Sequence, residues 1–274
     1  MIIFREFFKL RMFVASIFVA FITLLSMSEV VRFANDMKTP LSIYYVPHLF
    51  SNIHFVFFYG MSVCYLFSDI HVISKEFFFA VIRIGRTRYY CYRILVAFIQ
   101  SISLYLTVIL TVIMTSVPNI SWEFKWGKLI HTLCFFGAGY EYQIIPISQW
   151  RIETYYSPME AMMLSALITV SVCVFIAIVL CLTGCLFGKH VTTVVSVLLC
   201  LNTYFLMIFE QHEFFYYLTP FNWLRLSLFG QEYLPGIYYP SFKDVFLLTM
   251  ILSAILFVIN CIIVNYRDLT VEGI

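Results

Sequence analysis

Long apolar stretches that carry almost no charge constrain the fold of this chain more than any other feature. Residues 49–68, 94–117, 161–187, 191–209 and 245–264 contain no Asp, Glu, Lys or Arg, and residues 12–31 contain only Glu29. A run of about 20 apolar residues is long enough to cross the ~30 Å hydrocarbon core of a bilayer as a helix. We therefore predict an all-α polytopic membrane protein, a single transmembrane domain over residues 1–274, with these six stretches as its spans.

The composition supports this prediction. Of the residues, 62% are hydrophobic and 12% are charged, whereas about a quarter of a soluble domain is charged. The net charge of +2 is too small to indicate nucleic-acid binding. We expect the chain to be surrounded by membrane lipids and to bind no nucleic acid.

The N-terminal sequence predicts a membrane-surface helix followed by the first span. Arg5, Lys9 and Arg11 precede the apolar run, but the run has no small-residue cleavage site, which argues against a signal peptide. In residues 1–11, three phenylalanines share one helical face and the charged residues lie around the other, as in helices that lie in the membrane surface. A disordered basic flank is the alternative.

The distribution of basic residues sets the orientation. With six spans and both termini inside, ten basic residues fall in the 49 positions of the inner segments, which are 1–11, 69–93, 188–190 and 265–274. Seven fall in the 95 positions of the outer segments, which are 32–48, 118–160 and 210–244. Basic residues favour the cytoplasmic side, so both termini are expected in the cytoplasm. Residues 129–147 are apolar but contain Glu141 and Pro146; we favour an outer or re-entrant element there, with a seventh span as the alternative.

Motifs for catalysis, nucleotide binding and metal binding are missing from the sequence. There is no P-loop and no H-E-x-x-H, and the histidines are expected to pack or lie at interfaces, with His131 isolated. The outer acids, among them Glu153 and Glu160, are read as solvated loop charges. We expect no metal, no cofactor in this chain and no enzymatic activity of its own.

Uncharged groups within the predicted spans are expected to serve helix packing. Gln100, Asn202 and Asn260 should hydrogen-bond between helices, and Gly184 and Gly188 form a pattern that lets helices approach closely. The eight cysteines do not form a disulfide framework, since six lie within predicted spans, where Cys acts as a small apolar residue.

The inner segment 69–93 is the first part of the chain that carries functional information. Ser74 can cap a helix that continues through residues 75–84 and ends at Gly85. This helix is amphipathic, with apolar residues on one face and Lys75, Glu76 and Arg83 off it. We interpret it as a docking surface for a cytoplasmic partner. The alternative is a helix that lies at the membrane interface and binds no partner.

The second informative segment, residues 210–243, is aromatic and broken. It is too hydrophobic for a free loop, and Pro220 stands where a helix would start. Such a segment suits a re-entrant pair of short helices near the outer leaflet; an aromatic membrane anchor is the alternative.

The order of these features resembles the type-two permeases of ATP-binding-cassette exporters. The resemblance rests on the layout of nearly the whole chain, on the string IRIGRTRYYCYR after the inner amphipathic helix, and on LTPFNWLRLSLFG before the last span. The outer segment 118–160 is longer than the short turn that is usual in the family. It is either a lid over the exit of the pathway or a sign that one of the spans lies elsewhere in the sequence.

The resemblance implies partners and site residues. Two copies of a separate ATPase subunit, which binds ATP and Mg, would dock on the inner helix and the surface helix, and a second permease, identical or homologous, would complete the pathway. The implied site residues are Glu76, Phe77, Phe78, Val81 and Arg83 for ATPase coupling, Arg5 and Lys9 for the surface helix, and Phe215, Pro220, Phe221 and Trp223 for an outer gate.

The expected function is ATP-driven export of an amphipathic peptide, lipid or drug across a bacterial plasma membrane. A membrane receptor or immunity protein that binds a peptide without transporting it is the alternative, and a membrane enzyme ranks third.

Overall fold

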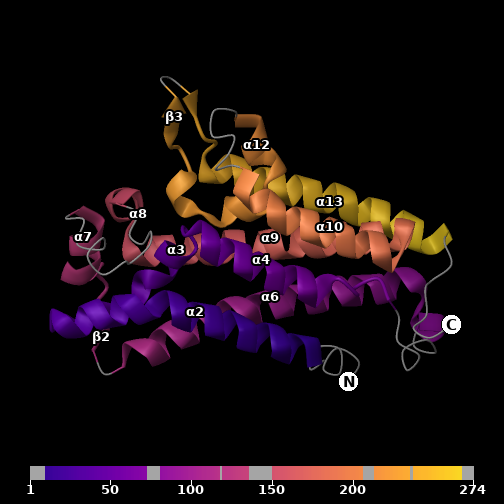
Figure 1. Ribbon diagram of the computed structural model, residues 1–274. Helices are drawn as coiled ribbons and strands as arrows, with labels where there is room; N and C mark the ends of the chain where they lie inside the picture. The colour runs from indigo at the N-terminus through magenta and orange to yellow at the C-terminus, as the bar shows by residue number, and fades with distance from the viewer. Residues whose placement is uncertain are drawn as a thin grey trace.

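The computed structural model of the chain describes residues 10–72, 81–117, 119–135, 150–205, 213–234 and 237–266. Within them the fold is a bundle of helices whose long members lie side by side (Figure 1). Four helices of 25 to 31 residues are long and apolar enough to cross a membrane. They are α2 (Leu10–Asp36), α6 (Arg86–Ser116), α9 (Pro158–Phe187) and α13 (Phe242–Tyr266). The described residues are predominantly helical, and four of the six predicted spans are confirmed as helices long and apolar enough to cross a membrane.

The predicted span 49–68 is wrong as a single straight helix. The chain forms the 3₁₀ helix η1 (Ile43–Tyr45) and the short helix α3 (Val46–Leu49), bends by 87°, and continues as α4 (Ile53–Phe67). The bend has a local cause, because the Asn52 side chain accepts hydrogen bonds from the backbone N–H groups of His54 and Phe55 and so caps a new helix. If the bent pair counts as one span, the described residues hold five candidates.

The predicted span 191–209 is described as far as residue 205, and residues 206–209 lie outside the described residues. It forms α10 (Lys189–Leu201) and the 3₁₀ helix η3 (Asn202–Tyr204). Only Gly188 separates α9 from α10, and its φ of 83° is a conformation that glycine adopts without strain. The predicted inner turn at 188–190 is therefore a single glycine break.

Buried contacts hold α9 at the centre of the bundle, where it packs against α4, α6, α10 and α13. Tyr105 of α6 donates a hydrogen bond to the Met162 carbonyl (3.2 Å) and Asn260 of α13 donates to the Ile178 carbonyl (3.3 Å). The second bond confirms the prediction that Asn260 links helices. Large apolar side chains on α2, α10 and α13 face outward, as expected for helices in contact with lipid.

Short elements gather at one end of the bundle, on the left in Figure 1. The β1 strand (Leu41–Ser42) pairs in parallel with β2 (Ile120–Ser121), in the register Leu41 to Ile120. Two short helices follow, α7 (Gly127–Phe135) and α8 (Trp150–Tyr155). The described part of 129–147 ends at Phe135 in this nine-residue helix, and the rest lies outside the described residues.

The aromatic segment before the last span folds into short elements, as predicted. They are α12 (Glu213–Leu218), the 3₁₀ helices η4 (Pro220–Leu224) and η5 (Leu226–Leu228), and the antiparallel pair β3 (Glu232–Leu234) and β4 (Ile237–Tyr238). Pro220 begins η4 at its first turn, where proline is favoured because its missing N–H would have no helical partner.

Candidate functional site

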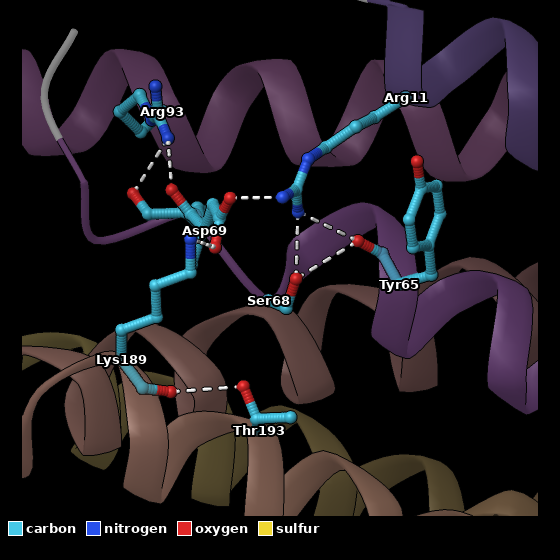
Figure 2. A network of polar contacts seen from close by, with 8 residues as sticks. Arg11, Tyr65, Ser68, Asp69, Arg93, Lys189 and Thr193 are labelled. Carbon is cyan, nitrogen blue, oxygen red and sulfur yellow. Dashed lines mark hydrogen bonds and ion pairs between the residues drawn. The ribbon is translucent and has the colours of Figure 1, made fainter. Parts of the chain in front are cut away.

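A network of charged and polar side chains joins four helices, at the opposite end of the bundle from β1 and β2. Asp69 lies just beyond Ser68, the C-cap of α4. Its carboxylate forms ion pairs with Arg11 in the first turn of α2 and with Lys189 at the start of α10, the latter at 3.8 Å (Figure 2). One carboxylate therefore connects α2, α4 and α10.

Arg11 makes further contacts with the last turn of α4. Its guanidinium donates to the Ser68 hydroxyl (2.8 Å) and to the Tyr65 carbonyl (3.2 Å), and it lies 5.3 Å from the centre of the Tyr65 ring. A guanidinium has several donors in a planar fork, which suits it to bind several acceptors at once. The start of α2 is thereby held on the end of α4.

Arg93 brings α6 into the same network. It is buried, and its guanidinium donates to the backbone carbonyls of Asp69 (3.0 Å) and Ile70 (2.9 Å). Both carbonyls lie beyond the end of α4, and the Asp69 carbonyl also accepts from the Val72 N–H (3.1 Å). Arg93 thus fixes the backbone path by which the chain leaves α4.

His71 occupies a close contact between this exit path and α9. A Cβ atom placed on Gly184 would lie 2.2 Å from the His71 ring, so only glycine fits there. Burial lowers the pKa of His71, and Arg93 and Lys189 lower it further while Asp69 opposes them. Gly184 is therefore a site of close approach, but to a side chain from the α4–α6 link rather than to another helix backbone.

The network carries an excess of positive charge. Among the described residues that form it, Arg11, Arg93 and Lys189 are cations and Asp69 is the acid. Removing the single carboxylate would leave three cations close together in a partly buried place, which is unfavourable. Asp69 is thus the residue on which the arrangement depends.

A cavity of about 350 Å³ lies beside this network, between α4 and α10. Apolar side chains form most of its wall, and hydroxyl groups of Ser68, Thr193 and Ser196 line it as well. Its volume falls at the lower end of the range of small-molecule sites. The cavity can accommodate an apolar group with a few polar atoms.

The predicted coupling residues are only partly covered by the structure. Residues 81–84 are helical and Gly85 interrupts the backbone with a φ of 94°, which confirms the predicted helix end. Val81 is buried within the chain and Arg83 is exposed. Glu76, Phe77 and Phe78 lie outside the described residues, as do Arg5 and Lys9 of the predicted surface helix.

The predicted gate residues lie at the other end of the bundle and pack inward. The Phe221 ring contacts Gly60 of α4, and Trp223 lies 5.8 Å from the Phe175 ring of α9 and donates to the Tyr216 carbonyl (2.9 Å). Pro220 is buried. Phe215 falls in α12, and its side chain lies outside the described set. In this structure Phe221 and Trp223 thus belong to the core.

Two polar residues that the sequence analysis did not single out hold the aromatic segment in place. Asn222 donates to the Thr203 carbonyl (2.9 Å) and Arg225 donates to the Ser51 carbonyl (3.0 Å). The second bond ties the segment to the bend between α3 and α4. The only hint in the sequence was the presence of polar residues within an otherwise aromatic string.

One expectation about an outer polar residue was wrong. His131, which has no second histidine at metal-ligand spacing in the sequence, contacts Glu153, with its Nδ1 2.8 Å from Oε1. Glu153 is not a solvated loop charge, since its side chain is 13% exposed. The two residues are 22 positions apart and are brought together because α7 packs on α8.

Two other histidines contact aromatic side chains, as predicted for packing residues. His48 is buried between the rings of Tyr45 and Trp126, and His54 contacts the Tyr204 hydroxyl (2.9 Å). All eight cysteines lie in the described residues and are free thiols. No group of three or more metal-ligating side chains occurs within the residues described.

Comparison of the chain with protein-family models, with curated proteins and with solved structures found no match.

Proposed function

We propose that the chain is the permease subunit of an ATP-binding-cassette exporter, with six spans and both termini in the cytoplasm of a bacterial cell. A separate ATPase subunit, in two copies, would hydrolyse ATP, and a second permease would complete the pathway. The cargo would be amphipathic: a peptide, a lipid or a drug. The single observation that carries the proposal is the convergence on Asp69 of side chains from α2, α6 and α10 at the end of α4.

Because of its position in the chain, Asp69 could transmit a movement of the predicted docking helix to the other helices. Residues 74–84, the predicted docking helix, begin five positions after Asp69 and end nine positions before Arg93. A partner that displaces this helix would pull on the backbone at Asp69 and Ile70, which Arg93 holds. The ion pairs of Asp69 would then pass the movement to α2 and α10.

The cavity between α4 and α10 supports an amphipathic cargo. Its apolar wall would hold the apolar part of the cargo, and the hydroxyls of Ser68, Thr193 and Ser196 would bind polar atoms. Because Ser68 also contacts Arg11, cargo in the cavity would lie directly beside the network that receives the movement.

The experiment is purification of the tagged chain from its native membrane in mild detergent, followed by mass spectrometry. The proposal expects a stoichiometric P-loop ATPase, and vanadate-sensitive ATP hydrolysis by the complex. In the double variant Phe77→Ala/Phe78→Ala, the ATPase should be lost while the chain still inserts, because buried aromatic residues commonly dominate interfaces.

A matched control is the double variant Phe21→Ala/Phe98→Ala, which removes two outward-facing rings from α2 and α6 and should retain the ATPase. Exposed Arg83 offers a second probe, since Arg83→Glu should weaken docking by reversing one charge. An intact chain that purifies without any ATPase from a complex stable in the detergent would overturn the proposal.

A further inference from the structure

The segment between α6 and α7 exposes two large aromatic side chains. Trp122 is 63% exposed and Phe124 is 76% exposed, whereas Trp126 in the same segment is buried. The Trp126 ring packs edge-on against His48 and its Nε1 donates to the Tyr156 carbonyl (3.1 Å). The segment therefore directs one tryptophan into the core and holds another on the surface.

The backbone of this segment is held in place on both sides. The Leu41 amide donates to the Asn119 carbonyl (2.7 Å), and β2 pairs with β1. The Asn119 side chain donates to the Asn35 side chain at the end of α2. The Phe124 ring lies 6.3 Å from the ring of buried Tyr44. The outward direction of Trp122 and Phe124 is thus a defined feature of the fold.

The two aromatic residues lie at the level where two candidate spans end. Helix α2 ends at Asp36 and α6 ends at Ser116. Exposed apolar side chains run along α6 to its end at Leu106, Leu110 and Met114, and Val117 continues the series at 61% exposed. The exposed apolar side chains of α6 therefore extend to Val117, where the segment that carries Trp122 and Phe124 begins.

We propose that Val117, Trp122 and Phe124 form an interfacial anchor that inserts into the bilayer at the level of the lipid headgroups, beside the ends of α2 and α6. The partner is the phospholipid surface itself. Tryptophan favours this level because its ring is apolar and its N–H can bond to water or headgroups. Exposed Lys125 and Lys128, which follow in the chain, would reach the lipid phosphates.

The anchor fixes the depth of α2 and α6 in the bilayer. Without it, a helix longer than the hydrocarbon core can tilt or slide at little cost. With it, movement of either helix along the membrane normal would carry Trp122 and Phe124 into the hydrocarbon or into water. This inference does not depend on the proposed transport function.

The test uses tryptophan fluorescence of the full chain in phosphatidylcholine nanodiscs. The contribution of Trp122 is the difference between the unmodified chain and Trp122→Phe, and the three remaining tryptophans serve as the internal reference. Nitroxide-labelled phosphatidylcholine carries the quencher either on the headgroup or near the end of the acyl chain. Iodide in the buffer reports exposure to water.

We expect headgroup nitroxide to quench the Trp122 contribution at least about twofold more than acyl-end nitroxide, as for an indole at the interface. Iodide should quench it less in nanodiscs than in detergent. The variant Trp122→Phe/Phe124→Trp moves the indole to position 124 and should give the same pattern, which guards against a local effect of one substitution.

Two results would overturn the inference. Strong iodide quenching without nitroxide quenching would place Trp122 in water. The second result is that neither iodide nor nitroxide quenches Trp122, and that quenching returns in nanodiscs that hold one chain each. It would show that a second copy of the chain, and not lipid, covers the segment.

Discussion

The Asp69 carboxylate at the end of α4 forms an ion pair with the Arg11 guanidinium in the first turn of α2. The pair closes the end of the bundle at which the chain leaves α4 for the segment that we propose as the ATPase contact. Arg11 also donates hydrogen bonds to Ser68 and to the Tyr65 carbonyl. This one guanidinium therefore contacts three residues at the end of α4. The relationship allows direct tests of how the bundle is held together.

Asp69→Asn should destabilise the folded chain by about 1–2 kcal/mol, because it removes two ion pairs and leaves three cations near one another. The free energy of unfolding in mixed micelles measures the loss. The control is Glu29→Gln, which removes an exposed pair with Arg32 at 3.8 Å and should change stability by less than about 0.5 kcal/mol. Equal effects of the two variants would refute a special role for Asp69.

Gly184→Ala should be destabilising by about 1–3 kcal/mol, because the added methyl group would meet the His71 ring. The double variant Gly184→Ala/His71→Ala should recover part of the loss, since it removes the ring that causes the clash. Gly188→Ala is the comparison: no atom lies within 4 Å of its Cβ position, and its cost comes from its φ of 83°. That cost should be about 1–2 kcal/mol and should not respond to His71→Ala.

Stability should fall in mild acid because of His71. Its pKa is lowered in the folded chain, so the unfolded chain binds a proton more readily. Acid therefore stabilises the unfolded state relative to the folded state. The contribution of neutral His71 to the free energy of unfolding is therefore complete above about pH 6.5 and is lost as the pH falls below that value. Unfolding in micelles between neutral and mildly acidic pH should show this slope, and His71→Gln should flatten it. A slope unchanged in His71→Gln would assign it to other groups.

Trp223→Phe should cost about 1–3 kcal/mol, because it removes one of three donors to the Tyr216 carbonyl, the other two being the Thr219 N–H and hydroxyl, and replaces a buried ring by a smaller one. The matched control is Trp150→Phe at the start of α8, which changes a side chain that is 47% exposed and should be nearly neutral. Thermal unfolding of the two variants compares them directly. If Trp223 instead served only as a movable gate, its substitution would leave the midpoint unchanged.

The sequence predicts the long helices because their signal is local. Each of α2, α6, α9 and α13 covers, to within one residue, one of the predicted apolar stretches, which are free of charge except for Glu29 in α2. Gly85 marks the end of a helix because it adopts a positive φ. The bend at Asn52 was missed because a hydropathy pattern registers length and not direction. Its signal was nevertheless present, since Ser51 and Asn52 interrupt an apolar run and Asn is a strong N-cap residue.

The network around Asp69 could not be predicted because its members lie far apart in the sequence. Lys189 follows Asp69 by more than a hundred positions, and no spacing rule joins them. The basic residues Arg11, Arg93 and Lys189 were recognised only as markers of orientation. A partial signal existed, because Asp69 and Glu76 are the two acids of the strongly basic segment 69–93.

The bend before α4 has a consequence for the surrounding lipid. At 1.5 Å per residue, the 15 residues of α4 extend only about 22 Å, which is less than the ~30 Å of a typical hydrocarbon core. The neighbouring α2 and α6 are longer than that core. We expect the bilayer to be thinner along the α4 side of the molecule than along the α2–α6 side. The protein would thus impose a gradient of membrane thickness around its own circumference.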